Sequence, residues 1–75
     1  MARMGVIWRL QRGSEQYEAL VTERPTGHCE LQYLLNGTLL DRLRLATGRC
    51  LAAIEDAVAK REHLKAEGWR ECRDC

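Results

Sequence analysis

Residues 28–45 read HCELQYLLNGTLLDRLRL, and this stretch decides the fold. Two apolar runs flank the pair Asn36-Gly37. A two-residue type I′ turn needs positive φ at both central residues, and Asn followed by Gly is the pair that most readily adopts it. We therefore predict a β-hairpin whose strands run from about His28 to Leu35 and from Thr38 to Leu45.

Two further segments toward the N-terminus also alternate between apolar and polar residues, which predicts strands at about Met4–Gln11 and Gln16–Glu23. Gly13-Ser14 separates these two strands as a turn signal. The next connection is Arg24-Pro25-Thr26-Gly27, where the proline fixes φ and the glycine tolerates a positive φ. Because all the connections are short, the four strands are expected to form an antiparallel meander.

The periodicity changes after Thr47, where apolar residues begin to recur at spacings of three and four. This pattern predicts a helix from about Arg49 to Glu67, with Thr47 as its N-cap. Gly68 is expected at C′, and Trp69 is expected to make the apolar contact of a Schellman motif. The apolar stripe of this helix would contain Cys50, Leu51, Ile54, Ala57, Val58 and Leu64.

These elements predict one α+β domain over residues 1–69: an antiparallel four-stranded meander (three to four strands), followed by one C-terminal amphipathic helix packed on one sheet face, in the order ββββα. The helix must cover one face of the sheet because neither apolar surface can remain in water. Residues 70–75 are predicted to be a short, polar, flexible tail. The predicted core comprises Val6, Trp8, Leu10, Tyr17, Ala19, Val21, Leu31, Tyr33, Leu35, Leu43 and Leu45, packed against Leu51, Ile54, Val58 and Leu64.

The composition is that of a folded protein, because 45% of the 75 residues are hydrophobic and 31% are charged. A chain of this length buries only about 60% of its unfolded surface, so oligomerisation, a metal or disulfides often add stability. No apolar run could span a membrane, and Arg9 and Arg12 interrupt any signal-peptide core. We therefore expect a cytoplasmic protein with reduced thiols at its four cysteines, Cys29, Cys50, Cys72 and Cys75.

The sheet face away from the helix is unusually apolar. Strand alternation places four large aliphatic residues on it, Ile7, Leu20, Leu34 and Leu40, among Arg9, Gln11, Glu18, Thr22, Glu30, Gln32, Arg42 and Arg44. A contiguous patch of this kind marks an interface, so we hypothesise a homodimer, or the docking of another protein, on this face. The competing interpretation is that the four residues are scattered and individually tolerated.

The assignment of faces depends on strand register, because a slip of one residue exchanges the two faces. Asp41 conflicts with the simple alternation, since it falls on the core face between Leu39 and Leu43. A β-bulge near Thr38–Leu40 would resolve this conflict, and so would a position of Asp41 at the end of the sheet.

Cys72-x-x-Cys75 is the one recognisable chemical motif, and it could supply half of a tetrahedral zinc site. The further ligand candidates are Cys50, His63 and the pair His28-Cys29. Because Cys50 and His63 lie near opposite ends of the predicted helix, we favour an exposed reduced pair without a cofactor, with zinc as the alternative. A redox role is disfavoured because the pair follows a helix C-terminus, where the helix dipole does not lower thiol pKa. His28 and Cys29 are neighbours in a strand and point to opposite faces, so they cannot act as base and nucleophile, and we predict no enzyme.

The net charge of +1, from 12 basic and 11 acidic residues, does not indicate nucleic-acid binding by itself. Arg9, Arg42 and Arg44 share the outer face, and Arg49, Lys60, Arg61 and Lys65 lie near the helix ends. A weak nucleic-acid-binding or regulatory module is therefore the alternative function. The aromatic residues alternate onto the core face, and Glu18 and Glu30 dilute the basic charge. We thus favour a small, non-enzymatic interaction or accessory protein that associates with itself or with another protein, without a membrane.

Overall fold

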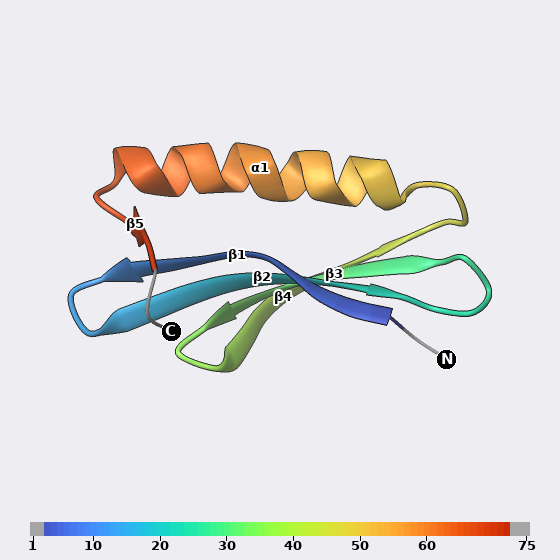
Figure 1. Ribbon diagram of the computed structural model, residues 1–75, viewed down its shortest axis with the longest axis horizontal. Helices are drawn as coiled ribbons and strands as arrows, with labels where there is room; N and C mark the ends of the chain where they lie inside the picture. Colours follow the sequence, from blue (N-terminus) through green and yellow to red (C-terminus); the bar gives the residue numbers. More distant parts are fainter. Residues whose placement is uncertain (1–2, 73–75) are drawn as a thin grey trace.

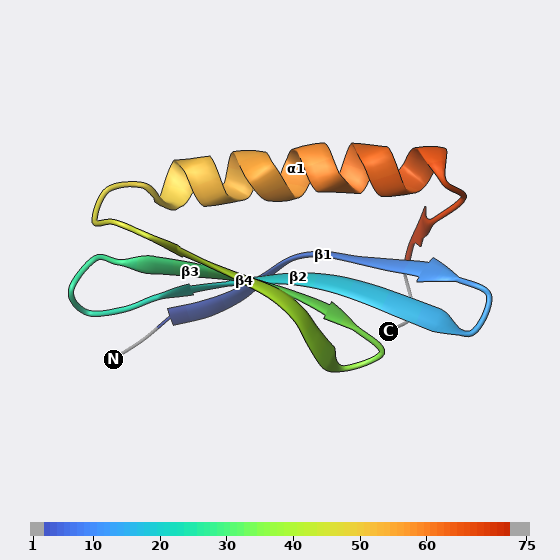
Figure 2. The ribbon, with the colours of Figure 1, turned by 180° about the vertical axis from the view of Figure 1, so that it is seen from behind.

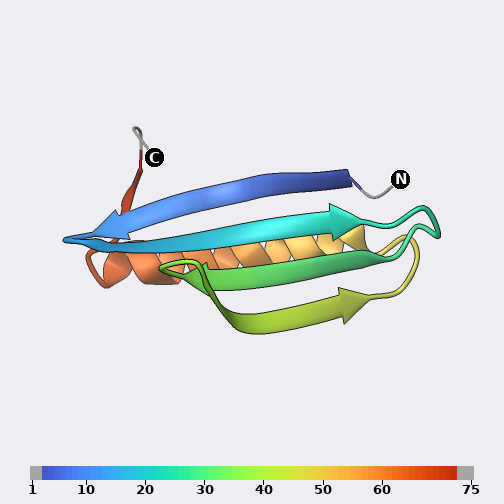
Figure 3. The ribbon, with the colours of Figure 1, turned by 90° about the horizontal axis from the view of Figure 1, so that it is seen from below.

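The computed structural model describes residues 3–72, which form one antiparallel sheet with one helix packed across a single face (Figures 1 and 3). The sheet order is β4-β3-β2-β1-β5. The predicted α+β architecture with ββββα order is confirmed, with a short fifth strand added. The elements are β1 Arg3–Arg12, β2 Glu15–Glu23, β3 Cys29–Leu35, β4 Thr38–Leu45, α1 Cys50–Ala66 and β5 Arg70–Glu71.

The hairpin that decides the fold has the predicted turn. Asn36 and Gly37 have φ values of 52° and 82°, so both central residues lie in the left-handed region. Leu35 pairs with Thr38 immediately beside them. The local sequence therefore sets the register at this end of β3 and β4.

Helix α1 begins and ends within one residue of its predicted bounds. Its C-terminus is a Schellman motif, as predicted: the Gly68 N–H donates to the Lys65 carbonyl at 3.1 Å, and the Trp69 N–H donates to the Leu64 carbonyl at 3.1 Å. The predicted N-cap is wrong, because Arg49 occupies that position without a capping side-chain bond. The Thr47 hydroxyl instead donates to the Thr26 carbonyl at 3.3 Å and joins two loops.

The predicted tail is partly structured. Arg70 and Glu71 form β5 and pair with Gln11 and Leu10 of β1, and the Cys72 N–H donates to the Arg9 carbonyl at 3.0 Å. The expectation of an unpaired tail is therefore wrong for these residues. The Schellman turn reverses the chain and brings it back to the open edge of β1.

A layer of aromatic rings fills the space between the sheet and the helix. The ring centroid of Trp8 lies 5.6 Å from that of Tyr17 and 6.0 Å from that of Tyr33. Trp69 packs edge-on against Tyr17, with 5.5 Å between their ring centroids. The indole N–H of Trp8 donates to the Ala57 carbonyl at 2.7 Å, which satisfies the buried nitrogen.

This layer determines which side of the helix faces the sheet. The rings already occupy most of the interlayer volume, so α1 approaches through the small, buried residues Ala53 and Ala57, together with Leu64. Leu51 is 67% exposed and Ile54 is also exposed, so their predicted core positions are wrong. The sequence pattern predicts that the side of α1 with the larger aliphatic residues faces the sheet, whereas in the structure the side with Ala53 and Ala57 does.

A bulge in β1 changes the faces of two predicted residues. Val6 pairs with Leu20 and Trp8 pairs with Ala19, which leaves Ile7 as the extra residue. Ile7 packs against the core cluster, and Val6 lies beside Leu20 on the uncovered face. The predictions that Val6 belongs to the core and Ile7 to the outer face are both wrong, because the bulge shifts the alternation by one residue.

The predicted bulge in β4 is confirmed. Tyr33 pairs with Asp41 and Leu34 pairs with Leu39, so Leu40 is the extra residue. Asp41 therefore keeps its place on the helix side but lies exposed on an edge strand. Leu43, a predicted core residue, is also exposed, because α1 runs along the middle of the sheet and leaves β4 outside its footprint (Figure 3).

Candidate functional site

The sheet face away from α1 carries one continuous apolar stripe, which we call the outer stripe: Val6, Leu20, Leu34 and Leu39. Val6 pairs with Leu20, and Leu34 pairs with Leu39. Leu20 pairs with Gln32, so it lies diagonal to Leu34, within reach of a long side chain. The stripe therefore crosses all four long strands obliquely.

The members of the outer stripe differ in exposure. Val6 is 47% exposed and Leu39 is 41% exposed, whereas Leu20 and Leu34 are half-buried between their neighbours. Of the predicted interface residues, the structure brings Leu20 and Leu34 together, moves Ile7 into the core, and leaves Leu40 exposed at the bulge beside Leu39. Val6 and Leu39 were missed because each bulge displaces the alternation by one residue.

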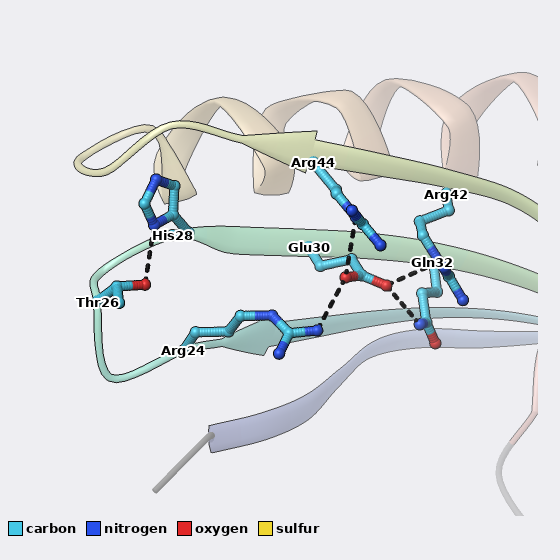
Figure 4. Close-up of polar contacts among 7 residues, drawn as sticks. All are labelled: Arg24, Thr26, His28, Glu30, Gln32, Arg42 and Arg44. Atoms are coloured by element: carbon cyan, nitrogen blue, oxygen red, sulfur yellow. Dashed lines mark hydrogen bonds and ion pairs between the residues drawn. The ribbon is translucent and has the colours of Figure 1, made fainter.

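The two sides of the outer stripe differ in charge. On one side Arg9 of β1 forms an ion pair with Glu18 of β2 at 3.0 Å. On the other side the carboxylate of Glu30 on β3 is surrounded by three arginines (Figure 4). We call Arg24, Arg42 and Arg44 the arginine cluster. The stripe thus separates a neutral ion pair from a group with excess positive charge.

Glu30 is the one charged residue buried among the described residues, with 5% of its surface exposed. Its Oε1 accepts bonds from Arg42 Nε at 2.8 Å and from Gln32 Nε2 at 2.9 Å. Its Oε2 lies 3.4 Å from Arg24 Nη2 and 3.7 Å from Arg44 Nε. A buried carboxylate is tolerated only when it is paired and hydrogen-bonded in this way.

These partners keep Glu30 ionised. The hydrogen bond from Gln32 lowers the pKa of the Glu30 carboxyl below its ordinary value, and the three arginines lower it further against the opposing effect of burial. Glu30 is therefore negatively charged at neutral pH and holds the three guanidinium groups together.

A cleft of about 620 Å³ lies beside the arginine cluster at one end of the sheet. The turn between β2 and β3 and the connection from β4 to α1 meet at this end (Figure 2). Arg24, His28, Glu30 and Arg44 line the cleft together with Cys29, Leu45 and Ala46. The sequence pattern did not indicate Arg24, and it offered His28 only together with Cys29, because a turn brings Arg24 and His28 beside β4.

The basic residues predicted for nucleic-acid binding do not form one patch. Arg42 and Arg44 belong to the arginine cluster, whereas Arg9 lies beyond the outer stripe with Glu18. The basic residues of the helix lie on the other side of the sheet. There Lys60 stands over the rings of Tyr17 and Tyr33, and Arg61 and Lys65 approach Glu71.

Cys29 at the start of β3 and Cys50 at the start of α1 form a disulfide. The expectation of reduced thiols is therefore wrong for this pair, and the structure shows why the sequence did not reveal it. The two residues are 21 positions apart and become neighbours only when the helix lies on the sheet. The bond fixes the first turn of α1 to the sheet, where no side chain caps the helix.

The predicted zinc ligands are not assembled in the described part of the chain. Cys72 is disulfide-bonded, Cys75 lies outside the described residues, and His63 pairs with Glu67 at the far end of α1. Within residues 3–72, the group of metal-ligating side chains that come within 4.8 Å of one another is Glu23, Cys29 and Cys50, and the disulfide uses both of its sulfurs. His28 shares a hydrogen bond with Thr26 at 2.8 Å and does not approach a nucleophile.

No protein-family model, curated protein sequence or solved structure matches the chain. Among the described residues, α1 is neither long nor apolar enough to cross a membrane. The uncovered sheet face and the groups beside it are therefore the features that bear on function.

Proposed function

We propose that the protein is a small, non-enzymatic interaction module that forms a homodimer through its uncovered sheet face. The observation that carries this proposal is the outer stripe, which is continuous across four strands and lies on the face that α1 leaves open. Fully burying one leucine or valine contributes about 1.5–3 kcal/mol relative to leaving it exposed. Four such residues in one stripe give a second sheet a sufficient apolar surface to pack against.

A second copy fits this face because two sheets can stack about 10 Å apart with their strands rotated by about 30°. The charges favour one arrangement. A two-fold axis along the outer stripe sets the arginine cluster of one copy over the Arg9–Glu18 side of its partner. A two-fold axis across the stripe would instead place two arginine clusters against each other, which like-charge repulsion disfavours.

The experiment is size-exclusion chromatography with light scattering over a range of protein concentrations. The expected mass is twice the chain mass of 8.6 kDa. The variants Leu20→Glu and Leu34→Glu should shift the protein to a monomer, because each places an unpaired charge in the centre of the interface. Leu51→Glu is the matched control: it changes an exposed leucine on the opposite layer and should leave the dimer intact.

A monomer of 8.6 kDa at the highest soluble concentration would refute the homodimer. An unchanged dimer in both outer-face variants, with dissociation in Leu51→Glu, would place the interface on the helix instead. Circular dichroism of each variant separates loss of association from loss of folding.

The oxidation state of the cysteines bears on the cellular compartment in which this interaction takes place. The sequence alone favoured a cytoplasmic location, whereas the Cys29–Cys50 disulfide favours an oxidising compartment, since cytosolic thiols are kept reduced. Trapping the thiols with an alkylating reagent in intact cells, followed by mass spectrometry, distinguishes the two. Alkylated Cys29 and Cys50 indicate the cytoplasm, and an intact disulfide indicates an oxidising compartment.

A further inference from the structure

We propose that the cleft beside the arginine cluster binds the phosphate group of a small phosphate monoester. The cleft lies at the end of the sheet, between the turn before β3 and the end of β4. A nucleic-acid interface would need basic residues spread over a long surface, whereas this cleft gathers its basic residues in one compact site.

The first observation is a surplus of positive charge held in place. Three guanidinium groups surround the single carboxylate of Glu30, which leaves two positive charges without a counterion in the cluster. Figure 4 shows the arginines reaching Glu30 from different parts of the sheet: Arg24 from the end of β2, and Arg42 and Arg44 from β4. Glu30 therefore orients cations that would otherwise repel one another.

The second observation is the number of donors that remain. Each guanidinium has five N–H donors, yet each contacts Glu30 through one nitrogen: Nη2 of Arg24, and Nε of Arg42 and Arg44. The three side chains are between 43% and 73% exposed, so the other N–H groups face solvent. Donors that are already oriented bind an anion with less loss of side-chain entropy.

The third observation is the cleft itself. Its volume of about 620 Å³ is in the range of small-molecule sites. Arg24 and Arg44 supply positive charge, His28 supplies a ring nitrogen, and Leu45 and Ala46 supply apolar surface. The Thr47 hydroxyl bond to the Thr26 carbonyl ties the two loops that border this end of the sheet.

These features select the ligand class. A guanidinium matches the geometry of phosphate through paired N–H bonds. A phosphate monoester carries a charge of about −1.5 to −2 at neutral pH, which balances the surplus of the arginine cluster. A phosphodiester or a carboxylate carries only one negative charge and would leave the site half-neutralised. The apolar lining favours a monoester with a small organic group over inorganic phosphate.

Isothermal titration calorimetry with phenyl phosphate, inorganic phosphate and a single-stranded oligonucleotide tests the proposal. Phenyl phosphate should bind saturably with one site per chain and more tightly than inorganic phosphate. Arg24→Gln and Arg44→Gln should each raise the Kd by about tenfold or more, because each removes charge-assisted hydrogen bonds. Arg9→Gln is the matched control: it removes an equal charge from the same face, outside the cleft, and should leave the Kd unchanged.

Three outcomes would overturn the proposal. The first is no saturable binding of either phosphate compound. The second is an equal effect of Arg9→Gln, which would mean that binding follows net charge rather than the cleft. The third is tighter binding of the oligonucleotide than of phenyl phosphate, lost in the same cluster variants, which would assign the site to a nucleic-acid backbone. The titrations are repeated with Leu20→Glu, in which no partner covers the outer face, so failure here and failure of the homodimer are distinguishable.

Discussion

The disulfide between Cys29 and Cys50 should supply a large part of the stability of this protein. A cross-link between residues 21 positions apart removes loop-closure entropy from the unfolded chain. In the chain-entropy treatment a loop of this length is worth about 3 kcal/mol at 25 °C. A domain of this size has a total unfolding free energy of about 5–15 kcal/mol, so the loss is a substantial fraction. We expect removal of the bond to lower Tm by about 12–24 °C.

The perturbation that isolates this bond is Cys50→Ser. Cys50 is partly exposed, so a serine hydroxyl is tolerated there, and the remaining thiol of Cys29 stays buried as a small apolar group. Thermal unfolding followed by circular dichroism, with and without a phosphine reductant, gives the change in Tm. Cys72→Ser is the control: it keeps the Cys29–Cys50 bond, so the reductant should still lower its Tm.

Three results would refute this reasoning. Four free thiols in the native, unreduced protein would show that the bond does not form. A Cys50→Ser variant that unfolds at the same temperature as the unreduced parent would show that the bond forms without stabilising the fold. Reductant sensitivity that disappears in Cys72→Ser would assign the effect to the other disulfide-bonded cysteine.

Two further predictions concern the core and the hairpin. The Tyr33 hydroxyl donates to Asp56 Oδ2 at 2.8 Å. Burial is the largest cause of a raised pKa of Tyr33, and this hydrogen bond is the next. Because the folded pKa lies above the unfolded value of about 10, this stabilisation is complete below pH 10 and is lost as the pH rises toward the folded pKa. Tyr33→Phe should lower stability at neutral pH by about 1 kcal/mol and flatten the alkaline decline in Tm, and parallel Tm curves above pH 10 would contradict this. Gly37→Ala should lower the free energy of unfolding, measured in urea, by about 1–2 kcal/mol because the φ of Gly37 is 82°. Gly5→Ala is the control, because it adds the same methyl group to open space at a residue without a positive φ. The Gly5→Ala change should leave the free energy of unfolding unchanged. Equal losses in the two glycine variants would show that strain at the turn is not the cause.

The candidate site could be predicted only in part. Alternation located an apolar outer face and two of its residues, Leu20 and Leu34, because they lie in regular stretches of strand. It misplaced Ile7 and Val6, since a bulge adds one residue and its position in β1 had no sequence marker. In β4 the conflict at Asp41 did mark the bulge, because a charged residue on a core face needs an explanation.

The sequence by itself determined the meander, the Asn36-Gly37 hairpin and the C-terminal end of α1. Each of these depends on contacts between residues close in the chain: positive φ values in a turn, short connections, and the bonds of a Schellman motif. Local chemistry of this kind can be read from neighbouring residues.

Only the tertiary structure decided the rotation of α1, the Cys29–Cys50 bond and the burial of Glu30. The rings of Trp8, Tyr17 and Tyr33 fill the layer under the helix, so small alanines face the sheet and the larger Leu51 is left exposed. The disulfide and the arginine cluster join residues from separate strands, turns and the helix. These features depend on volumes and distances across the layers, which the order of residues along the chain does not specify.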